Sequence, residues 1–374
     1  MIKFYPSAVL CAAAIFATPV AAQSSALGTL VSSTRLQGAP NEASAYRIRY
    51  QSSDKDGRPI IVTGAVIVPA GQAPAGGRPV VAWAHGAAGV AESCGISDKA
   101  ELLFPQIAGL QALLAAGYVV TAPDYQGLGN PGPHPFLVGA ASAHTVIDAV
   151  RAARAVPRSG ASSRYAIWGE SQGGFSSLWA GKLAARYAPE LTLVGVAAAA
   201  PPTDLKANLT GGTNAAVRAF LTAYATDSWS KVYNIPLTTV VRPATATLIG
   251  RLARNCVSLS GFALRTKIGM LRLAGQLRNV DLASSPRWAA LMQQNSVTPS
   301  GLNVPLLIAQ GSADVIVAPA VTRSFINRLC ASRMPVRIVT VDGGDHVSIG
   351  KRTADTTVSW LADRFAGTRP PNDC

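Results

Sequence analysis

One serine of this chain has the surroundings of a catalytic nucleophile. Ser171 is the centre of a G-x-S-x-G pattern within Trp168–Gly174, which reads WGESQGG. The pattern is short, but it follows a strand-like segment, Arg164–Trp168, and opens a segment of helical spacing, Gly173–Tyr187. A sharp turn between strand and helix lifts a serine hydroxyl clear of a sheet, and flanking glycines avoid collisions with neighbouring elements. An ordinary Gly-rich turn is the alternative; the context favours a nucleophile.

A serine hydroxyl is a weak nucleophile and needs a general base. The chain has four histidines, which are His85, His134, His144 and His346. Where such a serine lies between a strand and a helix, an acid and then a histidine follow it along the chain. Only His346 follows Ser171, in the glycine-rich segment VDGGDHV. We therefore expect His346 to be the base.

The acid that orients the histidine should follow the preceding strand. Asp314 ends the segment QGSAD directly after the strand-like run Val304–Gln310. Its carboxylate would hold the imidazole tautomer and stabilise the imidazolium. Asp342 and Asp345 are rivals because they lie close to His346 in sequence. Neighbouring side chains on an extended loop tend to point apart, so we favour Asp314.

A tetrahedral intermediate needs backbone N–H donors, which form the oxyanion hole. One should be the N–H of Gln172, the residue after the nucleophile. The other should come from HGAAG, His85–Gly89, which follows the strand-like run Pro79–Ala84. We expect Ala87 to supply it, with Ala88 as the alternative. His85 is expected to orient this loop rather than to transfer protons.

These residues need rigid elements to position them. Strand-like and helical segments alternate along most of the chain, which predicts a mostly parallel sheet covered by helices on both faces. The expected strands are Ala45–Ser52 with Pro59–Pro69 as an early hairpin-like pair, then Pro79–His85, Tyr118–Ala122, Arg164–Trp168, Leu191–Ala198, Val304–Gln310 and Val336–Val341. The expected helices are Glu101–Ala116, Ala143–Val156, Gly173–Tyr187, Ala318–Leu329 and Asp355–Phe365.

The alternation stops over residues 203–300, which have a mainly helical pattern. Connections in compact α/β domains are usually about 2–6 residues long, so we expect an inserted cap here. The insertion is basic, with three lysines and eight arginines against three aspartates. It divides the expected fold into a first core part, 23–202, and a second core part, 301–374.

One segment of this insertion, Phe262–Asn279, has the pattern of a cationic amphipathic helix. It could lie on an anionic lipid surface. The alternative, which we favour, is that its apolar face packs on the core of the insertion. The apolar face comprises Leu264, Ile268 and Leu271, and the cations are Arg265, Lys267, Arg272 and Arg278.

Composition excludes several classes of protein. Of 374 residues, 49% are hydrophobic and 14% are charged, which excludes a mostly disordered chain. After the N-terminus no apolar run is long enough for a polytopic membrane protein. The net charge of +14 suggests nucleic acid as a partner, but the sequence has no recognised nucleic-acid-binding motif. We therefore do not expect the protein to bind nucleic acid.

The N-terminus resembles a secretory signal peptide over residues 1–22. Lys3 precedes the apolar run Ala8–Phe16, and Val20 and Ala22 suit a cleavage site before Gln23. A short membrane anchor is the alternative, but the apolar run is too short to span a bilayer comfortably. We expect a secreted or periplasmic protein.

Four cysteines remain after cleavage, which are Cys94, Cys256, Cys330 and Cys374. In an exported protein they suggest two disulfides, and the sequence allows three connectivities. A zinc site is a weak alternative because no pair has C-x-x-C spacing.

The chain resembles the secretory lipase family of α/β-hydrolases over essentially all of its mature length. Besides HGAAG and GESQGG, the residues that carry the resemblance are PDYQGLG at Pro123–Gly129, GSAD at Gly311–Asp314 and DGGDH at Asp342–His346. PDYQGLG discriminates better than G-x-S-x-G, which many hydrolases share. The resemblance implies an α/β-hydrolase fold with a large helical cap and a triad of Ser171, Asp314 and His346. It also implies the disulfides Cys94–Cys256 and Cys330–Cys374.

The expected activity is ester hydrolysis through an acyl-enzyme, without a metal or organic cofactor. The resemblance implies lipid substrates of the triacylglycerol type. The alternatives are an esterase for short-chain or aromatic esters, a serine peptidase or an acyltransferase on the same fold, and a catalytically silent binding module. Specificity depends on cap side chains, which the sequence does not map.

Overall fold

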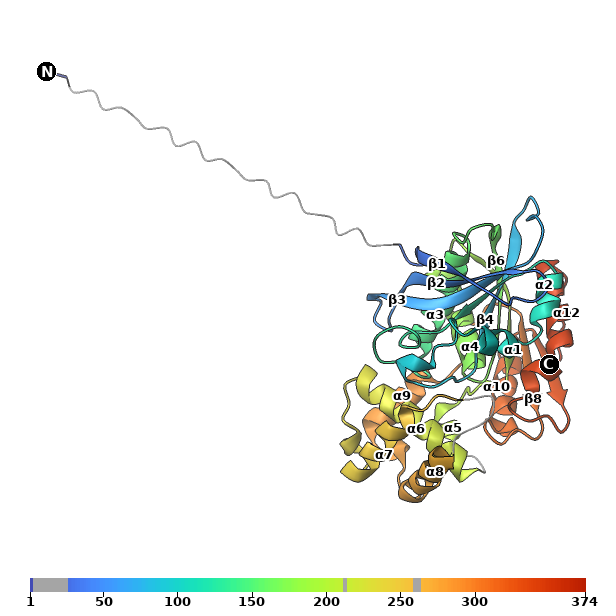
Figure 1. Cartoon of the computed structure of the whole chain (residues 1–374). Coiled ribbons are helices and arrows are strands. Elements are labelled where there is room, and N and C mark those ends of the chain that lie inside the picture. Colours follow the sequence, from blue (N-terminus) through green and yellow to red (C-terminus); the bar gives the residue numbers. More distant parts are fainter. Residues whose placement is uncertain (3–25, 211–213, 258–263) are drawn as a thin grey trace.

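The computed structural model describes residues 1–2, 26–210, 214–257 and 264–374. Almost all of the expected signal peptide, and residues 262–263 of the expected amphipathic helix, lie outside the described residues. Figure 1 shows a sheet flanked by helices, with a group of helices below it.

The centre of the molecule is a nine-stranded sheet with the order β1-β2-β3-β5-β4-β6-β7-β8-β9. The neighbouring strands β1, β2, β3 and β5 pair antiparallel. The neighbouring strands β5, β4, β6, β7, β8 and β9 pair parallel. The parallel part places the carboxyl ends of its strands at one edge. The strands are β1 (Leu30–Leu36), β2 (Ser44–Ser53), β3 (Pro59–Val68), β4 (Arg78–Ala84), β5 (Val119–Pro123), β6 (Ala161–Glu170), β7 (Thr192–Ala199), β8 (Leu306–Gly311) and β9 (Val336–Val341).

Helices cover both faces of the sheet, as the alternating pattern predicts. On one face α3 (Gly139–Ala153), α4 (Gln172–Tyr187) and α10 (Pro319–Ala331) share an apolar core with the strands. On the other face the core includes α1 (Ala100–Gln106), α2 (Leu110–Ala115), α11 (Ile349–Arg352) and α12 (Ala354–Phe365). This is the α/β-hydrolase arrangement.

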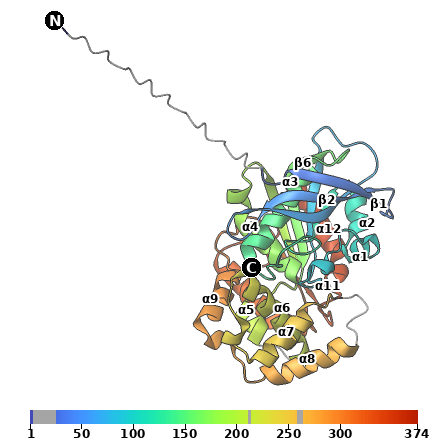
Figure 2. The ribbon, with the colours of Figure 1, turned by 60° about the vertical axis from the view of Figure 1, so that its left-hand side comes forward.

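A long helical segment joins β7 to β8, although these two strands are parallel neighbours in the sheet. Its apolar side chains continue the core on the α3–α4 face. Figures 1 and 2 both show these helices together beyond one edge of the sheet. They are α5 (Leu205–Thr210), α6 (Ala215–Val232), α7 (Pro243–Ala253), α8 (Leu264–Leu277) and α9 (Pro286–Asn295), with single turns η2 (Leu237–Thr239) and η3 (Leu282–Ser284).

One expectation about secondary structure is wrong, and one strand is missed. The segment Glu101–Ala116 is two helices, because the chain turns at Gly109, whose φ is +66°. The edge strand β1 is not foreseen, since its sequence LVSSTRL has no alternation of buried and exposed residues. The early antiparallel pair is confirmed as β2 and β3.

The favoured interpretation of the amphipathic segment is also wrong. Leu264, Ile268 and Leu271 are 74%, 44% and 65% exposed, so they do not pack on the core of the helical segment. The opposite side of α8 packs there instead, through Met270 and Leu273. Helix α8 therefore has an apolar stripe on each of two opposite sides. With apolar residues on both sides, the sequence does not indicate which side is buried.

No helix within the described residues is both long enough and apolar enough to cross a membrane.

Candidate active site

Ser171 lies in the turn between β6 and α4. Its φ of 54° and ψ of −121° are unusual for a residue with a side chain, and such strain persists only where the surroundings hold it. The Ser171 N–H donates to the carbonyl of Ala199 in β7 at 2.8 Å, which fixes the backbone of the turn. The hydroxyl is thereby placed at the start of α4.

The two glycines of the pattern are required by close approach. A Cβ at Gly169 would lie 2.4 Å from the backbone of Gly173, and a Cβ at Gly173 would lie 1.8 Å from the carbonyl oxygen of Ala84. Both contacts are with backbone, which has little freedom to move. Glycine at these positions therefore allows β4, β6 and α4 to meet beneath Ser171.

Three side chains from distant parts of the sequence form a hydrogen-bonded chain. The Nε2 of His346 lies 2.8 Å from Ser171 Oγ, and the Nδ1 lies 2.7 Å from Asp314 Oδ2. Asp314 follows β8 and His346 follows β9, so both come from the carboxyl ends of parallel strands. In this arrangement Nδ1–H donates to the carboxylate and Nε2 can accept the serine proton.

The Asp314 carboxylate is buried and held on several sides. Its Oδ1 accepts from the N–H groups of Ile316 and Val317 at 2.8 and 2.9 Å, and Gln310 Nε2 donates to Oδ2 at 3.0 Å. Burial by itself would raise the pKa of Asp314. The hydrogen bonds from His346 and the two N–H groups outweigh that effect, so the pKa is lowered and the carboxylate stays ionised.

The two rival acids bind elsewhere. Asp342 accepts from Ser312 Oγ at 2.9 Å, and Asp345 accepts from the Ser348 N–H at 2.8 Å. Both are exposed. Of the three aspartates weighed from sequence, Asp314 is the one with a hydrogen bond to His346.

The expected oxyanion donors lie at the same place. A Cβ at Gly86 would be 3.7 Å from Ser171 Cβ, so the HGAAG loop lies against Ser171. Within the described residues, neither the Ala87 N–H nor the Gln172 N–H donates to a protein acceptor. The Gln172 N–H is also one of the free donors at the start of α4. Both groups are available to an incoming oxygen.

His85 orients one of these donors. Its Nδ1 lies 2.6 Å from the Gly86 carbonyl oxygen, and Tyr125 Oη donates to the His85 carbonyl at 3.0 Å. In a trans peptide the carbonyl and the following N–H point in opposite directions, so holding Gly86 O also sets the Ala87 N–H. Burial lowers the pKa of His85, which suits a neutral ring with one N–H donor.

His134 holds the side chain of Gln172, a contact that the sequence analysis misses. Its Nε2 lies 3.0 Å from Gln172 Nε2, and its Nδ1 lies 2.7 Å from the carbonyl of Gln126. Burial lowers the pKa of His134 to about 4, so the ring is neutral and Nε2 accepts from the amide. No sequence signal distinguishes His134, because its partner Gln126 lies in the same loop and Gln172 lies 38 positions away.

The PDYQGLG marker stabilises the loop region around HGAAG. Asp124 accepts from the N–H groups of Ile96 and Ser97 at 2.8 and 2.9 Å, and from Thr63 Oγ1 at 2.7 Å. A hydroxyl hydrogen bond from Ser97 completes its shell. This buried carboxylate therefore ties the loop after β4 to β3, on one side of the site.

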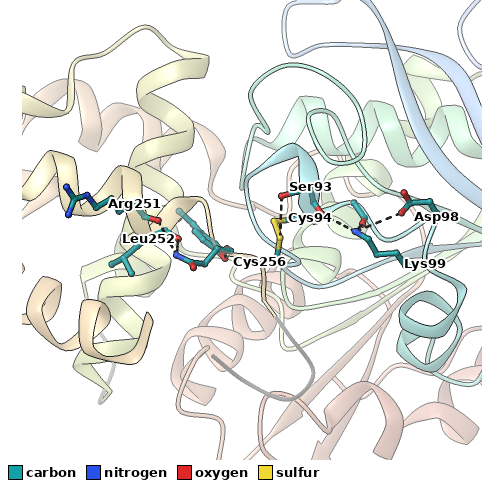
Figure 3. Close-up of a disulfide and its surroundings, with 10 residues drawn as sticks. Ser93, Cys94, Asp98, Lys99, Arg251, Leu252 and Cys256 are labelled. Carbon is teal, nitrogen blue, oxygen red and sulfur yellow. Dashed lines mark hydrogen bonds and ion pairs between the residues drawn. A yellow bond between two sulfur atoms is a disulfide. The ribbon is translucent and has the colours of Figure 1, made fainter. Parts of the chain in front are cut away.

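A disulfide ties the same loop to the helical segment. Cys94 is bonded to Cys256, and Cys330 to Cys374, which are the two pairs that the family resemblance implies. Figure 3 shows the first bridge between the loop at Ser93 and the end of α7. Next to it the Val257 N–H donates to the Ala88 carbonyl at 2.8 Å. The loop that carries Ala87 is thus anchored from outside the sheet.

Glu170 is an acidic residue directly before Ser171 in the chain. No described residue donates a hydrogen bond to its carboxylate, and a Cβ at Gly350 would lie 2.0 Å from its Oε2. Burial raises the pKa of Glu170 to about 7, against the attraction of His346 and Lys351. The sequence pattern treats this position as variable and gives no warning of it.

A cavity of about 370 Å³ lies near His134, between the core and the helical segment. It is lined by Val90–Glu92 after β4, by Gly132–His134, and by Asp227, Ser228 and Lys231 of α6. Lys231 pairs with Asp227 at 2.6 Å. Within the described residues, no group of three or more His, Cys, Asp or Glu is arranged to hold a metal ion.

The chain resembles known hydrolases in sequence and in structure. A probable inactive lipase of Mycobacterium tuberculosis is 25% identical over 353 residues, which cover 88% of this chain and 75% of that protein. Candida antarctica lipase A aligns with a TM-score of 0.75 at 18% identity, over 93% of this chain and 84% of that one. LipA, a rice cell wall degrading esterase of Xanthomonas oryzae, aligns with a TM-score of 0.74 at 20% identity, over 92% and 100% of the two chains.

Four lipases of Candida albicans and Malassezia globosa match 70–71% of this chain and 57–60% of their own lengths. These relatives support a hydrolase of the lipase and esterase type. The family model for secretory lipases matches residues 100–373, which is most of the chain. The protein therefore belongs to the secretory lipase family.

Proposed function

We propose that this protein is a secreted serine lipase or carboxylesterase that hydrolyses acyl esters, with lipids of the triacylglycerol type as its substrates. His346 takes the proton of Ser171, and Ser171 Oγ attacks the ester carbonyl. The alcohol leaves with that proton, and an acyl-enzyme remains. Water activated by His346 then releases the acid and regenerates the serine.

One observation carries the proposal: the continuous hydrogen-bonded chain from Ser171 through His346 to Asp314, at 2.8 and 2.7 Å. Ser171, at one end of this chain, is only partly buried, so a substrate can approach its Oγ. Asp314, at the other end, is buried and stays ionised. The free N–H groups of Ala87 and Gln172 would stabilise the oxyanion. Removing one such donor typically lowers the rate about 100-fold or more.

The helical segment over residues 203–300 is proposed to be a cap that shapes substrate access. Support comes from three contacts near the nucleophile: the Cys94–Cys256 bridge, the Val257–Ala88 hydrogen bond, and the hydrogen bond from Ser228 Oγ to the His134 carbonyl at 2.5 Å. Through them the segment contacts the loop that carries Ala87 and the loop whose His134 contacts the Gln172 side chain.

Export is proposed to remove residues 1–22. The secretory family and the two disulfides support an extracellular protein, since disulfides persist in oxidising compartments.

An esterase for short-chain or aromatic esters is the second candidate. The cavity beside His134 favours it, because charged side chains such as Glu92 and Lys231 suit a polar alcohol better than a long acyl chain. One structural relative is named a cell wall degrading esterase, at nearly the same TM-score as the lipase.

Initial rates on p-nitrophenyl esters from acetate to palmitate, at equal enzyme concentrations, test the proposal. We expect a maximum at medium or long chains and loss of nearly all turnover in Ser171→Ala, which retains the fold. A maximum at acetate with a steep fall thereafter would replace the lipase by the short-chain esterase. Substantial turnover by Ser171→Ala would contradict both the lipase and the short-chain esterase assignments.

A further inference from the structure

Helix α8 has two apolar stripes on opposite sides. Thr266, Gly269, Met270 and Leu273 are buried against the rest of the helical segment. A Cβ at Gly269 would lie 2.9 Å from Leu252 of α7, which shows how closely α7 and α8 approach. The packing of α8 is therefore already satisfied by this stripe.

The second stripe points away from the protein. Leu264, Ile268 and Leu271 are 74%, 44% and 65% exposed. At about 100° per residue, these three positions lie within roughly 60° of one another around the helix axis. Figures 1 and 2 both show α8 at the end of the molecule away from β1. Three large apolar side chains thus form one outward face.

Cations border this face on both sides. Arg265 and Arg272 lie along one border of the stripe and Lys267 along the other, and all three are exposed. Helix α8 has no acidic residue. None of the three cations forms an ion pair within the described part of the chain. Their long side chains can extend beside an apolar surface while the charges reach anionic groups.

We propose that this face of α8, Leu264, Ile268 and Leu271 bordered by Arg265, Lys267 and Arg272, docks the protein on anionic lipid surfaces. An exposed apolar stripe with cations on both borders is the pattern of a helix that lies in a lipid interface. The apolar side chains enter the acyl boundary, and the cations contact the headgroup phosphates. Docking would hold the enzyme at an anionic membrane independently of ester cleavage.

A lipid surface fits this face better than a second copy of the chain. Two such faces brought together would oppose Arg265, Lys267 and Arg272 to the same cations, without acids on α8 to neutralise them. The overall net charge of +14 would add to that repulsion. An anionic bilayer instead attracts both the face and the whole protein.

The experiment uses mature protein with Ser171→Ala, so that vesicles are not hydrolysed. Binding is measured by co-sedimentation with vesicles of phosphatidylcholine alone or with added phosphatidylglycerol. We expect preference for the anionic vesicles, and at least tenfold weaker binding for Leu264→Ser/Ile268→Ser/Leu271→Ser. Arg265→Gln/Lys267→Gln/Arg272→Gln should weaken binding to anionic vesicles about 100-fold, since each of the three cations near the surface contributes roughly fivefold.

Control variants carry the same kinds of substitution elsewhere. Val31→Ser replaces an exposed apolar residue of β1, and Arg35→Gln/Arg49→Gln/Arg186→Gln removes three exposed cations away from α8. Both should bind vesicles far more like the parent than the α8 variants do. With Ser171 present, the α8 variants should keep the parent rate on soluble p-nitrophenyl butyrate.

Two results would overturn the proposal. One is equal vesicle binding by the parent and both α8 variants. The other is a parent dimer in analytical ultracentrifugation that the α8 apolar variant dissociates, which would make the face an interface between copies. Because binding is read with Ser171→Ala, a failed lipase assignment leaves this test intact.

Discussion

At the scale of single residues, the site combines one strained backbone with several buried hydrogen bonds. Ser171 at φ 54° is held by Ala199, and His346 is held by Asp314, which Gln310 and two N–H groups hold in turn. Each group is thus positioned by a second group behind it. For the proposed reaction, such preorganisation would place the reacting atoms before a substrate arrives.

Replacing Asp314 directly tests whether this residue positions His346. Asp314→Asn should lower kcat by roughly 10³–10⁴, because the imidazole loses the group that fixes its tautomer and stabilises its charge. The matched variants Asp342→Asn and Asp345→Asn should stay within a few-fold of the parent, since both residues bind other partners. Steady-state kinetics on p-nitrophenyl butyrate measure all three, and a severe loss in Asp345→Asn alone would reassign the acid.

Glu170 gives a prediction about pH and stability. Its folded pKa of about 7 lies above the ordinary 4.5, so the folded state binds a proton that the unfolded state releases. The free energy of unfolding contributed by this group therefore falls as pH rises from 4.5 to 7 and stays low above 7.

Glu170→Gln removes that titration. We expect it to raise the free energy of unfolding at pH 8, by up to about 3 kcal/mol, and to change it little at pH 4. Urea unfolding followed by tryptophan fluorescence at both values measures the difference between variant and parent. Equal stability of the two proteins at pH 8 would contradict the assignment.

At the scale of elements, the loop after β4 is held by more than its own strand. Asp124 and Tyr125 hold it from the loop that follows β5, and the Cys94–Cys256 bridge holds it from the helical segment. The loop carries the expected donor Ala87, so its position matters for the rate as well as for stability.

The two disulfides can therefore be separated by function. Cys94→Ser/Cys256→Ser should lower stability by roughly 5 kcal/mol, since the bridge closes a long loop, and should also lower kcat. Cys330→Ser/Cys374→Ser removes a bridge that closes a shorter loop near the C-terminus, between cysteines 44 positions apart. This variant should lower stability less and leave kcat unchanged. Urea melts and single-turnover rates distinguish them; an unchanged kcat in the first variant would remove the link to Ala87.

Two glycines should respond in opposite ways to the same substitution. Gly173→Ala places a Cβ 1.8 Å from the Ala84 carbonyl oxygen, so we expect loss of activity and of several kcal/mol of stability, or failure to fold. Gly275→Ala meets nothing within 4 Å on α8 and should stabilise by about 0.5–1 kcal/mol through helix propensity. Thermal melts of both variants test the pair, and a tolerant Gly173→Ala would contradict the close packing.

At the scale of the whole molecule, the sequence predicts the parts with strong local patterns. Buried parallel strands have near-continuous apolar runs, so β4 to β9 are foreseen, and the order of Ser171, Asp314 and His346 along the chain follows from that topology. β1 and the break at Gly109 are missed because neither has a period in the sequence. The direction of α8 is missed because burial depends on its neighbours α6 and α7.

The supporting residues at the site are missed for a related reason. His134 and Gln310 act through side chains that meet only after folding, and no short motif contains both partners. Glu170 lies within the motif, but its environment depends on Gly350 of α11. Contacts between distant segments set these roles, and a single sequence does not encode them locally.

Covalent labelling with a fluorophosphonate tests the central claim, that Ser171 is a nucleophile activated by His346. Intact-mass spectrometry and peptide mapping of the mature protein should give one adduct, at Ser171. Ser171→Ala should give none, and His346→Ala should label at least 100-fold more slowly. A parent protein that stays unlabelled, or is labelled at another residue, would contradict the account and indicate a catalytically silent member of the family.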